Sequence, residues 1–236
     1  KVGDFHLHEV SIAEGSLELN ADVELIIDSK RRKKIVSNHS ATHLLHSALR
    51  KVLGESVEQR GSLVNEEKLR FDFSHSNKVT DDQIMEIEDI VNLKIEEAID
   101  TKTEVLPYED ALKTGALAFF GDKYGEKVRV VYINGDFSVE FCGGTHVSRT
   151  GDIGSFKITD ESSLASGVRR IQAVTGPQSL VEMQDNAITV NKLQALLNEP
   201  KIKLIERVEN LLIEKKKLEK LSKNKIRLKE NDGLLD

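Results

Sequence analysis

The sequence has 236 residues and a formal net charge of −6, and this length suits one large domain or one domain with attachments. No apolar run approaches the roughly 18 residues of a membrane span, and residues 1–10 contain no signal-peptide segment. We therefore expect neither a membrane partner nor secretion. The one cysteine, Cys142, cannot form an internal disulfide, which is typical of the reducing cytoplasm.

The charge is unevenly distributed along the chain. Residues 201–236 carry a net charge of +4, whereas residues 1–200 carry −10. An acidic body argues against non-specific coating of nucleic acid, but it leaves room for a local basic site. The run Lys30–Lys34 is a candidate for that site, and a solvated strand end or turn is the alternative interpretation.

The first 34 residues have the pattern of strands. Apolar and polar residues alternate between Val10 and Ile27 around turn signals at Gly15 and at 20–22. This alternation predicts three short strands that form part of a small β-barrel or sheet. A unit of only two or three strands is marginally stable by itself, and Lys1 is not a natural start. We therefore expect residues 1–34 to be excised from a larger unit.

Residues 35–176 are predicted to form an α+β domain, in which a mixed or antiparallel sheet packs against helices. The apolar spacing and the cap residues predict helices that begin at 37–38, at 80–82 and at Tyr108. The predicted strands lie at 63–64, 69–73, 105–106, 128–133, 137–141, 155–158 and 168–174. Asn134-Gly135 is a hairpin signal between two of them.

Residues 177–236 are predicted to form a helical arm. Pro177 suits the first position of a helix, and Pro200 interrupts the helical pattern. A two-helix hairpin bent at Pro200 is one interpretation. A coiled coil that supports self-association is another, although Lys215 lies on its apolar seam.

Two residue pairs with equal spacing carry the main chemical signal. His39 and His43 are four residues apart in a predicted helix, so their rings project from one face. Cys142 and His146 repeat this spacing after a predicted strand, and the two glycines between them permit a tight turn. Three imidazoles and a thiolate suit Zn²⁺, so the sequence predicts one zinc ion per chain.

The same residues have more ordinary interpretations. A pair of histidines can be exposed or capping, and a lone cysteine is usually a small buried hydrophobe. Four of the eight Cys and His residues fall into the two equal pairs, which favours the metal site. Zinc peptidases carry Glu directly after their first His, whereas Ser40 follows His39, so peptide cleavage would lack its general base.

Five motifs carry a resemblance to a known family. They are His39–His43, Gln59–Val64, Arg70–His75, Cys142–His146 and Gly167–Ile171. Together they closely resemble the editing domain of alanyl-tRNA synthetases. This domain also occurs in free-standing editing proteins and, more distantly, in threonyl-tRNA synthetases. The resemblance runs from about residue 8 to the tail, and residues 149–154 favour the synthetases over the short free-standing relatives.

The resemblance implies a module that hydrolyses the ester of mischarged seryl- or glycyl-tRNA(Ala), with the acceptor end of tRNA(Ala) as its partner. It also implies zinc at the four paired residues and a substrate contact by Gln59. Arg60 stands where relatives often carry Lys, which keeps the charge. ATP-dependent ligation of alanine would need an upstream catalytic domain that this sequence lacks, and no nucleotide-binding fingerprint occurs in it.

Further residues are candidates for holding the substrate. An aminoacyl ester is activated, so water needs only orientation and some electrostatic help. Thr42, Gln59 and the backbone amides of Gly143 and Gly144 are candidates for holding the amino acid or the developing oxyanion. Arg169 and Arg170, with Arg60, are candidates for tRNA binding through phosphate, and ordinary edge-strand charges are the alternative interpretation.

Selectivity sets a further requirement. Alanine lies between glycine and serine in volume, so size alone cannot spare it. A hydrogen bond to the serine hydroxyl can distinguish serine from alanine. Gln59 suits this contact better than Thr42, because the Gln59 side chain is longer and its amide can both donate and accept. Zinc could be structural with four ligands or catalytic with three. There are two alternative functions. One is a non-catalytic tRNA-binding or dimerising module with structural zinc, and the other is a metallohydrolase that acts on a small molecule.

Overall fold

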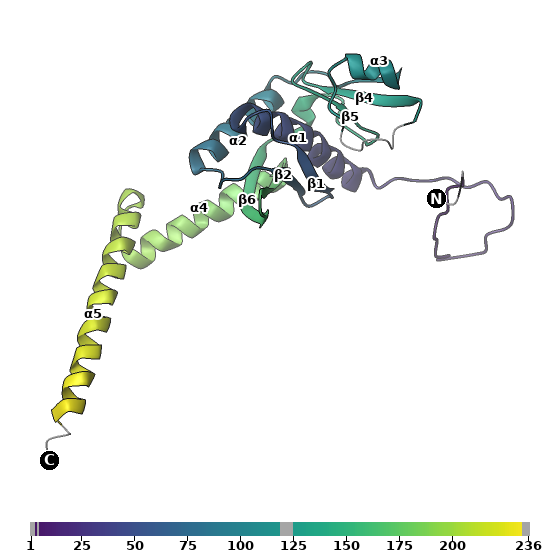
Figure 1. Cartoon of the computed structure of the whole chain (residues 1–236). Helices are drawn as coiled ribbons and strands as arrows, with labels where there is room; N and C mark the ends of the chain where they lie inside the picture. Colours follow the sequence, from purple (N-terminus) through teal and green to yellow (C-terminus); the bar gives the residue numbers. More distant parts are fainter. Residues whose placement is uncertain (1–2, 4, 119–124, 233–236) are drawn as a thin grey trace.

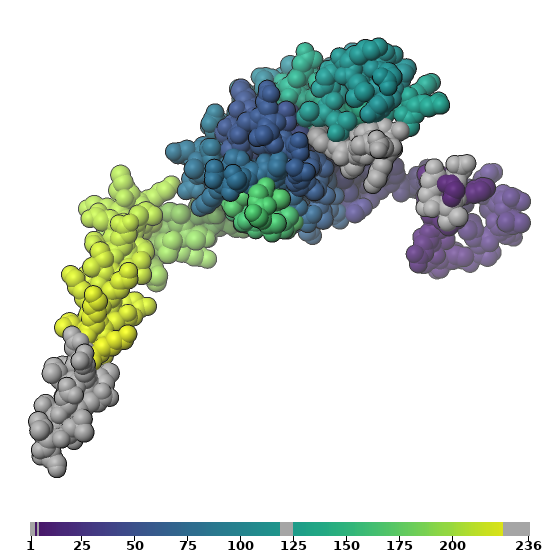
Figure 2. Space-filling view, in the orientation of Figure 1, coloured from purple at the N-terminus to yellow at the C-terminus, as the bar shows by residue number. Residues whose placement is uncertain are grey.

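The computed structural model describes residues 3, 5–118 and 125–232, the last nine of them by backbone alone. A folded body lies between an extended N-terminal segment and two long helices that lead away from the body (Figure 1). The space-filling view shows that these helices form an arm with little cover from the rest of the chain (Figure 2). No helix in the described ranges is long and apolar enough to cross a membrane.

The described residues contain five α-helices and seven strands. The helices are α1 (Ser29–Leu53), α2 (Asp81–Glu96), α3 (Tyr108–Lys113), α4 (Pro177–Leu197) and α5 (Leu204–Asp232). The strands are β1 (Gln59–Val64), β2 (Leu69–Ser74), β3 (Lys102–Pro107), β4 (Lys127–Ile133), β5 (Ser138–Phe141), β6 (Phe156–Ala165) and β7 (Val168–Thr175). Two 3-10 turns are η2 (Thr150–Ile153) and η3 (Lys201–Lys203).

The strands form two open antiparallel sheets, so the expected α+β class is confirmed. The first sheet has the order β1-β2-β7-β6, and the second has the order β3-β4-β5. Helices α1 and α2 pack against each other and against the first sheet. The main core between them includes the fully buried Leu45, Phe71, Ile87 and Ile171. A smaller core joins α3 to the second sheet around Val130.

Local signals in the sequence explain several elements. Thr80 and Gln83 form a reciprocal capping box at the start of α2, as the cap at 80–82 predicts. The hairpin of β1 and β2 turns at 65–68 as expected. The loop 134–137 joins β4 to β5, and Asn134 and Gly135 in it both have positive φ (56° and 60°), a conformation that these two residue types tolerate best. A helix or strand is present at each position predicted in the body, but β1, β3 and β6 are longer than predicted.

The three strands predicted in residues 1–34 are not confirmed. Described residues 6–28 form no helix or strand, and apolar side chains such as Leu19 (93% exposed) and Ile26 (83% exposed) face solvent. Alternation produces a strand only where a neighbouring strand and an apolar surface are available. The described part of this chain supplies neither to residues 6–28. No partial barrel is present among the described residues.

Helix α1 begins earlier than the cap predicted at 37–38. Asp28 is its N-cap, and its Oδ1 accepts a hydrogen bond of 3.0 Å from the backbone N–H of Arg31. The basic run Lys30–Lys34 therefore forms the first exposed turns of α1, and not a strand end or turn. The boundary expected between residues 34 and 35 falls inside this helix.

The arm bends between residues 198 and 203. Helix α4 begins at Pro177, as predicted, and ends at Leu197, followed by the C-cap Asn198 in the left-handed conformation. Helix α5 then diverges from the corner at Pro200, so that most of its length does not lie against α4 (Figure 1). Leu204 is buried at this corner, whereas Leu212 and Leu218 are more than half exposed. The coiled coil stays a prediction, and the last residues of the predicted arm, 233–236, lie outside the described part.

Candidate metal centre

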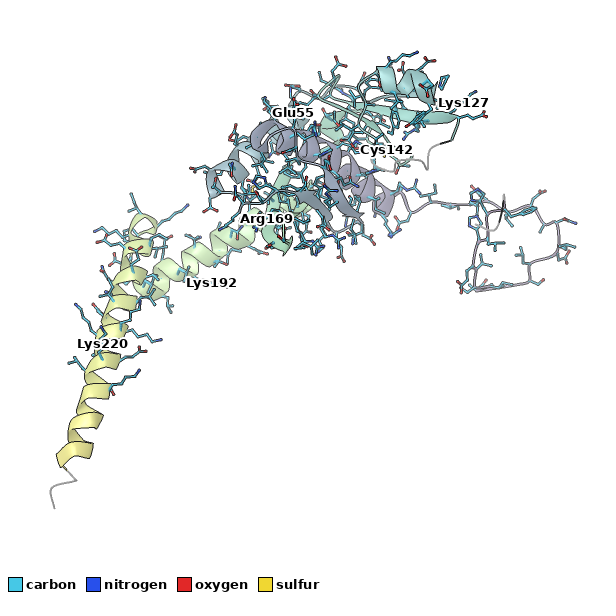
Figure 3. All side chains as sticks on the ribbon, in the orientation of Figure 1. Glu55, Lys127, Cys142, Arg169, Lys192 and Lys220 are labelled. Carbon is cyan, nitrogen blue, oxygen red and sulfur yellow. The ribbon has the colours of Figure 1, made fainter. Side chains whose placement is uncertain are left out.

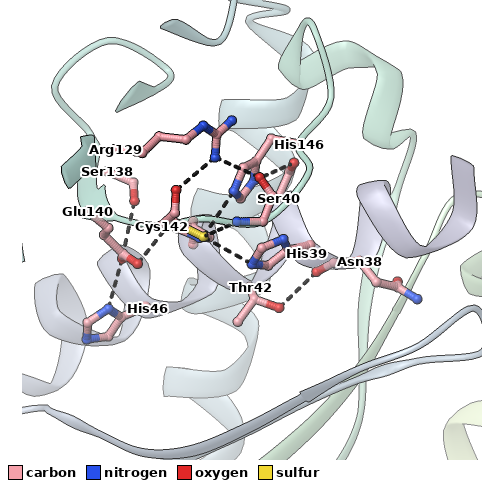
Figure 4. A network of polar contacts seen from close by, with 12 residues as sticks. Asn38, His39, Ser40, Thr42, His46, Arg129, Ser138, Glu140, Cys142 and His146 are labelled. Atoms are coloured by element: carbon pink, nitrogen blue, oxygen red, sulfur yellow. Dashed lines mark hydrogen bonds and ion pairs between the residues drawn. The ribbon is translucent and has the colours of Figure 1, made fainter. Parts of the chain in front are cut away.

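Two elements bring the paired His and Cys residues together. Helix α1 presents His39 and His43 one turn apart, and the loop after β5 presents Cys142 and His146. One ligand atom from each side chain lies within 4.8 Å of all the others. Figure 3 places Cys142 in the folded body, at the side of α1, and Figure 4 shows His39, His146 and Cys142 converging. The structure therefore contains a His/Cys group that could hold a metal.

The distances in this group suit a tetrahedral ion. Cys142 Sγ lies 3.5 Å from His39 Nε2 and 3.3 Å from His146 Nε2. Zinc bonds of roughly 2.0–2.3 Å at tetrahedral angles separate a sulfur from a nitrogen by about 3.5 Å. The His39 and His146 rings stack at 4.2 Å between centroids, and His43 meets His146 edge to face at 4.7 Å. The ligand set therefore fits zinc in chemistry and in spacing.

Each of the three rings is also contacted at its other nitrogen. His39 Nδ1 lies 3.1 Å from the carbonyl oxygen of Thr145, and His146 Nδ1 lies 3.2 Å from Ser40 Oγ. His43 Nδ1 lies 2.9 Å from a carboxylate oxygen of Glu140, in an ion pair that is not a straight hydrogen bond. Partners at Nδ1 leave Nε2 to face the centre, which is the usual arrangement around zinc.

The loop that carries Cys142 is tightly held. Arg129 on β4 donates hydrogen bonds of 2.8 Å and 2.7 Å to the carbonyl oxygens of Cys142 and Gly144. A Cβ added at Gly144 would lie 2.2 Å from Cε1 of His39, whereas a Cβ at Gly143 would meet nothing within 4 Å. Glycine is therefore required at position 144 for the loop to approach α1, and position 143 has no such requirement.

The electrostatics of the group favour a thiolate. Burial alone would raise the pKa of Cys142, but contacts from His146, His39 and His43 lower it to about 3. Burial and the neighbouring positive charge lower the pKa of His146 to about 4. Burial opposes the charge on His43 too, yet the Glu140 carboxylate raises its pKa to about 10. At neutral pH the metal-free group thus presents a thiolate, which is the form that binds zinc.

A pocket of about 410 Å³ opens beside this group. The side chains of the candidate ligands His39, His43 and Cys142 form part of its wall. Apolar and polar residues form the rest, and these are Ile35, Val64, Phe71, Phe141, Thr42, His46, Gln59, Ser62, Glu140, Gly144 and Thr145. The pocket is of a size that suits an amino acid and the end of a nucleotide.

The structure distributes the candidate substrate-binding groups unevenly around this pocket. Thr42 Oγ1 donates a hydrogen bond of 2.8 Å to the carbonyl oxygen of Asn38, so only its acceptor side is available. The amide of Gln59 has no hydrogen bond to a described residue and lies in the pocket wall. Gly144 N–H donates to Cys142 Sγ at 3.5 Å, and Gly143 is exposed and does not line the pocket.

The candidate tRNA-binding arginines do not line the pocket. Arg169 pairs with Glu161 through two contacts of 2.6 Å. Arg170 pairs in the same bidentate way with Asp72, at 2.7 Å and 2.9 Å. Arg60 is exposed and lies 3.0 Å from Glu58. A phosphate would have to compete with these carboxylates, and the roles of the three arginines stay predictions.

A second cavity, of about 670 Å³, lies along the opposite side of α1. Its wall includes Lys30, Lys33 and Lys34 from the basic run, together with Glu66, Glu67 and Asp152. Positive and negative side chains balance there, and none of the four candidate metal ligands reaches it. The smaller pocket is therefore the better candidate for chemistry.

The sequence did not indicate the residues that support the centre. Arg129, Glu140 and Ser40 come from different elements, and their contacts depend on how α1 crosses the second sheet. One signal was available for Glu140. It lies within the apolar strand β5, two residues before Cys142, so it shares that residue's side of the strand.

Part of the chain matches a family model, and nearly all of it matches a segment of known proteins. Residues 128–172, which include Cys142 and His146, match the family described as "Threonyl and Alanyl tRNA synthetase second additional domain". The chain is 49% identical over 220 residues to an alanine–tRNA ligase of Saccharophagus degradans, and 50% identical over 206 residues to that of Fervidobacterium nodosum. These matches cover 93% and 87% of this chain, but 25% and 24% of the relatives.

A third match extends further along the chain. It is 47% identical over 235 residues to an alanine–tRNA ligase of Herminiimonas arsenicoxydans, which covers 98% of this chain and 27% of that relative. The chain therefore spans about a quarter of the length of the relatives it matches, and the segment it matches includes the additional domain.

Proposed function

We propose that this chain, which corresponds over nearly all of its length to one segment of alanine–tRNA ligases, hydrolyses the ester bond of mischarged tRNA. The substrates are seryl- and glycyl-tRNA(Ala), and the partner is the acceptor end of tRNA(Ala). The reaction is editing in the cytoplasm. ATP-dependent ligation of alanine is assigned to other parts of a full-length ligase, because no nucleotide-binding fingerprint occurs in this sequence.

One observation carries this proposal. The His/Cys group lies in the wall of the same pocket as the amide of Gln59, which has no hydrogen-bond partner among the described residues. Part of this chain, residues 128–172, is similar to a tRNA synthetase additional domain. A zinc ion held by His39, His43, Cys142 and His146 would supply positive charge beside the reacting ester. The match and the pocket together favour hydrolysis of a tRNA-linked ester over reaction with a free small molecule.

The residues of the pocket have distinct roles in the proposed reaction. Apolar walls around Phe71 and Val64 exclude bulk water from the amino acid. Thr42 offers an oxygen lone pair for the α-amino group or the attacking water, because its proton is donated to Asn38. An activated ester needs little more than such orientation. The chain therefore contributes positioning and water exclusion, which suits hydrolysis.

Gln59 is assigned the selection of serine. Its amide can donate to the serine hydroxyl and accept from it, and no described residue occupies either function. Alanine cannot make this contact, and a buried amide left without a partner costs binding energy. Glycine is removed through its unhindered ester.

A second function is favoured by the ligand count. Four protein ligands complete a tetrahedral zinc site, and such closed sites are structural. In that case the chain would be a tRNA-binding or dimerising module without catalysis, with the arm as a surface for self-association.

Deacylation separates these functions. The zinc-loaded chain is incubated with seryl-tRNA(Ala), and the release of serine is followed beside a sample treated with a chelator. The proposed function predicts release well above the spontaneous rate in the loaded sample only. Binding of tRNA(Ala) without release of serine would support the non-catalytic module.

A further inference from the structure

A buried carboxylate lies directly behind the candidate metal ligands. Glu140 on β5 is 4% exposed, and its two oxygens face different partners. Oε2 lies 2.9 Å from His43 Nδ1, and Oε1 lies 3.0 Å from His46 Nδ1. Ser138 Oγ donates a weaker contact of 3.4 Å to Oε1 (Figure 4). Burying a carboxylate is costly unless it is paired in this way, so its position calls for an explanation.

The three candidate imidazole ligands differ in what supports them. His39 is supported by a backbone carbonyl and His146 by a hydroxyl, which are neutral groups. His43 alone is supported by a carboxylate. A neutral imidazole has one N–H and one lone pair, so a carboxylate at Nδ1 fixes the proton there and leaves the lone pair at Nε2. Such a pair holds the ring and makes it a better donor to a metal.

We propose that Glu140 is a positioning residue for the metal centre, and that it fixes His43 in the orientation and tautomer that present Nε2 to the ion. This inference rests on the metal centre of the proposed function. His46 completes the arrangement from the other side. It lies three residues after His43 on α1 and holds Oε1, which keeps Oε2 directed at His43.

The variant Glu140→Gln tests the assignment with little change in shape. A glutamine offers one acceptor and one donor group, so it cannot accept from both His43 and His46. One of the two rings must then turn or change its tautomer. We expect the pH-independent dissociation constant for Zn²⁺ to rise about 10- to 100-fold. It is obtained by competition with a chromophoric chelator at several pH values and corrected for the proton that zinc displaces from His43. We also expect a changed visible spectrum when Co²⁺ replaces Zn²⁺, since that spectrum reports ligand geometry.

The matched control is Glu88→Gln on α2. Glu88 is also nearly buried, and it binds Lys157 at 2.8 Å and the backbone N–H of Ile158 at 2.6 Å. It does not line the pocket or belong to the His/Cys group. We expect this control to lose stability but to bind Zn²⁺ and Co²⁺ as the wild type does.

The outcomes are distinguishable. Wild-type zinc affinity and an unchanged Co²⁺ spectrum in folded Glu140→Gln would overturn the inference, and so would an equal loss of affinity in Glu88→Gln. No metal binding by the wild-type chain would overturn the metal centre and this inference together. If Glu140→Gln does not fold, Glu140→Asp retains the charge but has a shorter reach. It should bind Zn²⁺ about tenfold more weakly, and unchanged affinity would contradict the assignment.

Discussion

Gly144→Ala is the sharpest perturbation of the candidate metal centre. The added Cβ would lie 2.2 Å from Cε1 and 2.7 Å from Nδ1 of His39. To restore an ordinary contact, the ring or the loop must move by about 1.2 Å. Metal sites tolerate ligand displacements of only about 0.2 Å. The substitution should therefore remove His39 from the ligand set or displace Cys142 with its loop.

The expected magnitude follows from the loss of one ligand in four. A loss of about 100-fold in zinc affinity lowers the stabilisation by a saturating metal by about 2.7 kcal/mol. For a chain of this length, that corresponds to a fall of about 5–10 °C in the melting temperature of the zinc-loaded protein. The melting temperature of the chelator-treated protein should fall less.

Thermal unfolding with and without zinc measures both values, and Gly143→Ala is the control. A Cβ at position 143 meets nothing within 4 Å, so this variant should retain the zinc-dependent stabilisation. Full stabilisation of Gly144→Ala by zinc would refute the assignment of His39 to the centre. Equal losses in both variants would show that the loop tolerates no side chain, and the argument from the close approach to His39 would be wrong.

Three further predictions address substrate, arm and pH. Gln59→Met should weaken transition-state binding of seryl-tRNA(Ala) by about 1–3 kcal/mol and affect glycyl-tRNA(Ala) less; equal losses in single-turnover rates would make Gln59 part of the general machinery. Removal of residues 201–236 should leave the body folded, because few of the described side chains of α5 (204–223) are buried. Loss of a cooperative thermal transition for residues 35–176 would contradict this. Zinc binding at pH 7–9 should release about one proton, which comes from His43, because the raised pKa of His43 (about 10) keeps this residue protonated in the metal-free protein. Cys142 has no thiol proton to lose, because its pKa is lowered to about 3. The apparent zinc affinity should then increase about tenfold per pH unit, and calorimetry in buffers of different ionisation enthalpy that detects no released proton would exclude this charge arrangement.

Local signals in the sequence were sufficient for much of the body. The capping box at Thr80 and the turn at Asn134-Gly135 act within a few residues, so their elements form as the sequence predicts. The early start of α1 was missed because Lys30–Lys34 has no apolar period, although lysine and arginine are good helix formers. The strands predicted before α1 are not confirmed, because strands depend on distant partners and residues 6–28 have none among the described residues.

The candidate site also has features that the local sequence predicts and features that depend on the fold. The equal spacing of the two His and Cys pairs was visible in the sequence, and the structure brings all four side chains together. The support from Glu140 depends on β5 passing behind α1, which no local pattern indicates. The pairing of Arg170 with Asp72 follows from the register of β2 and β7, which places these residues opposite each other. The sequence alone therefore could not predict whether a charged side chain is already paired with a carboxylate.

The central claim is that this chain is a metal-dependent deacylase that distinguishes serine from alanine. The most direct measurement is single-turnover hydrolysis of seryl- and alanyl-tRNA(Ala) by the zinc-loaded chain, compared with spontaneous hydrolysis of each ester. The account predicts rapid release of serine, with alanine released near the spontaneous rate. Release of serine at no more than the spontaneous rate, in the presence of the folded, zinc-loaded chain, would contradict this account.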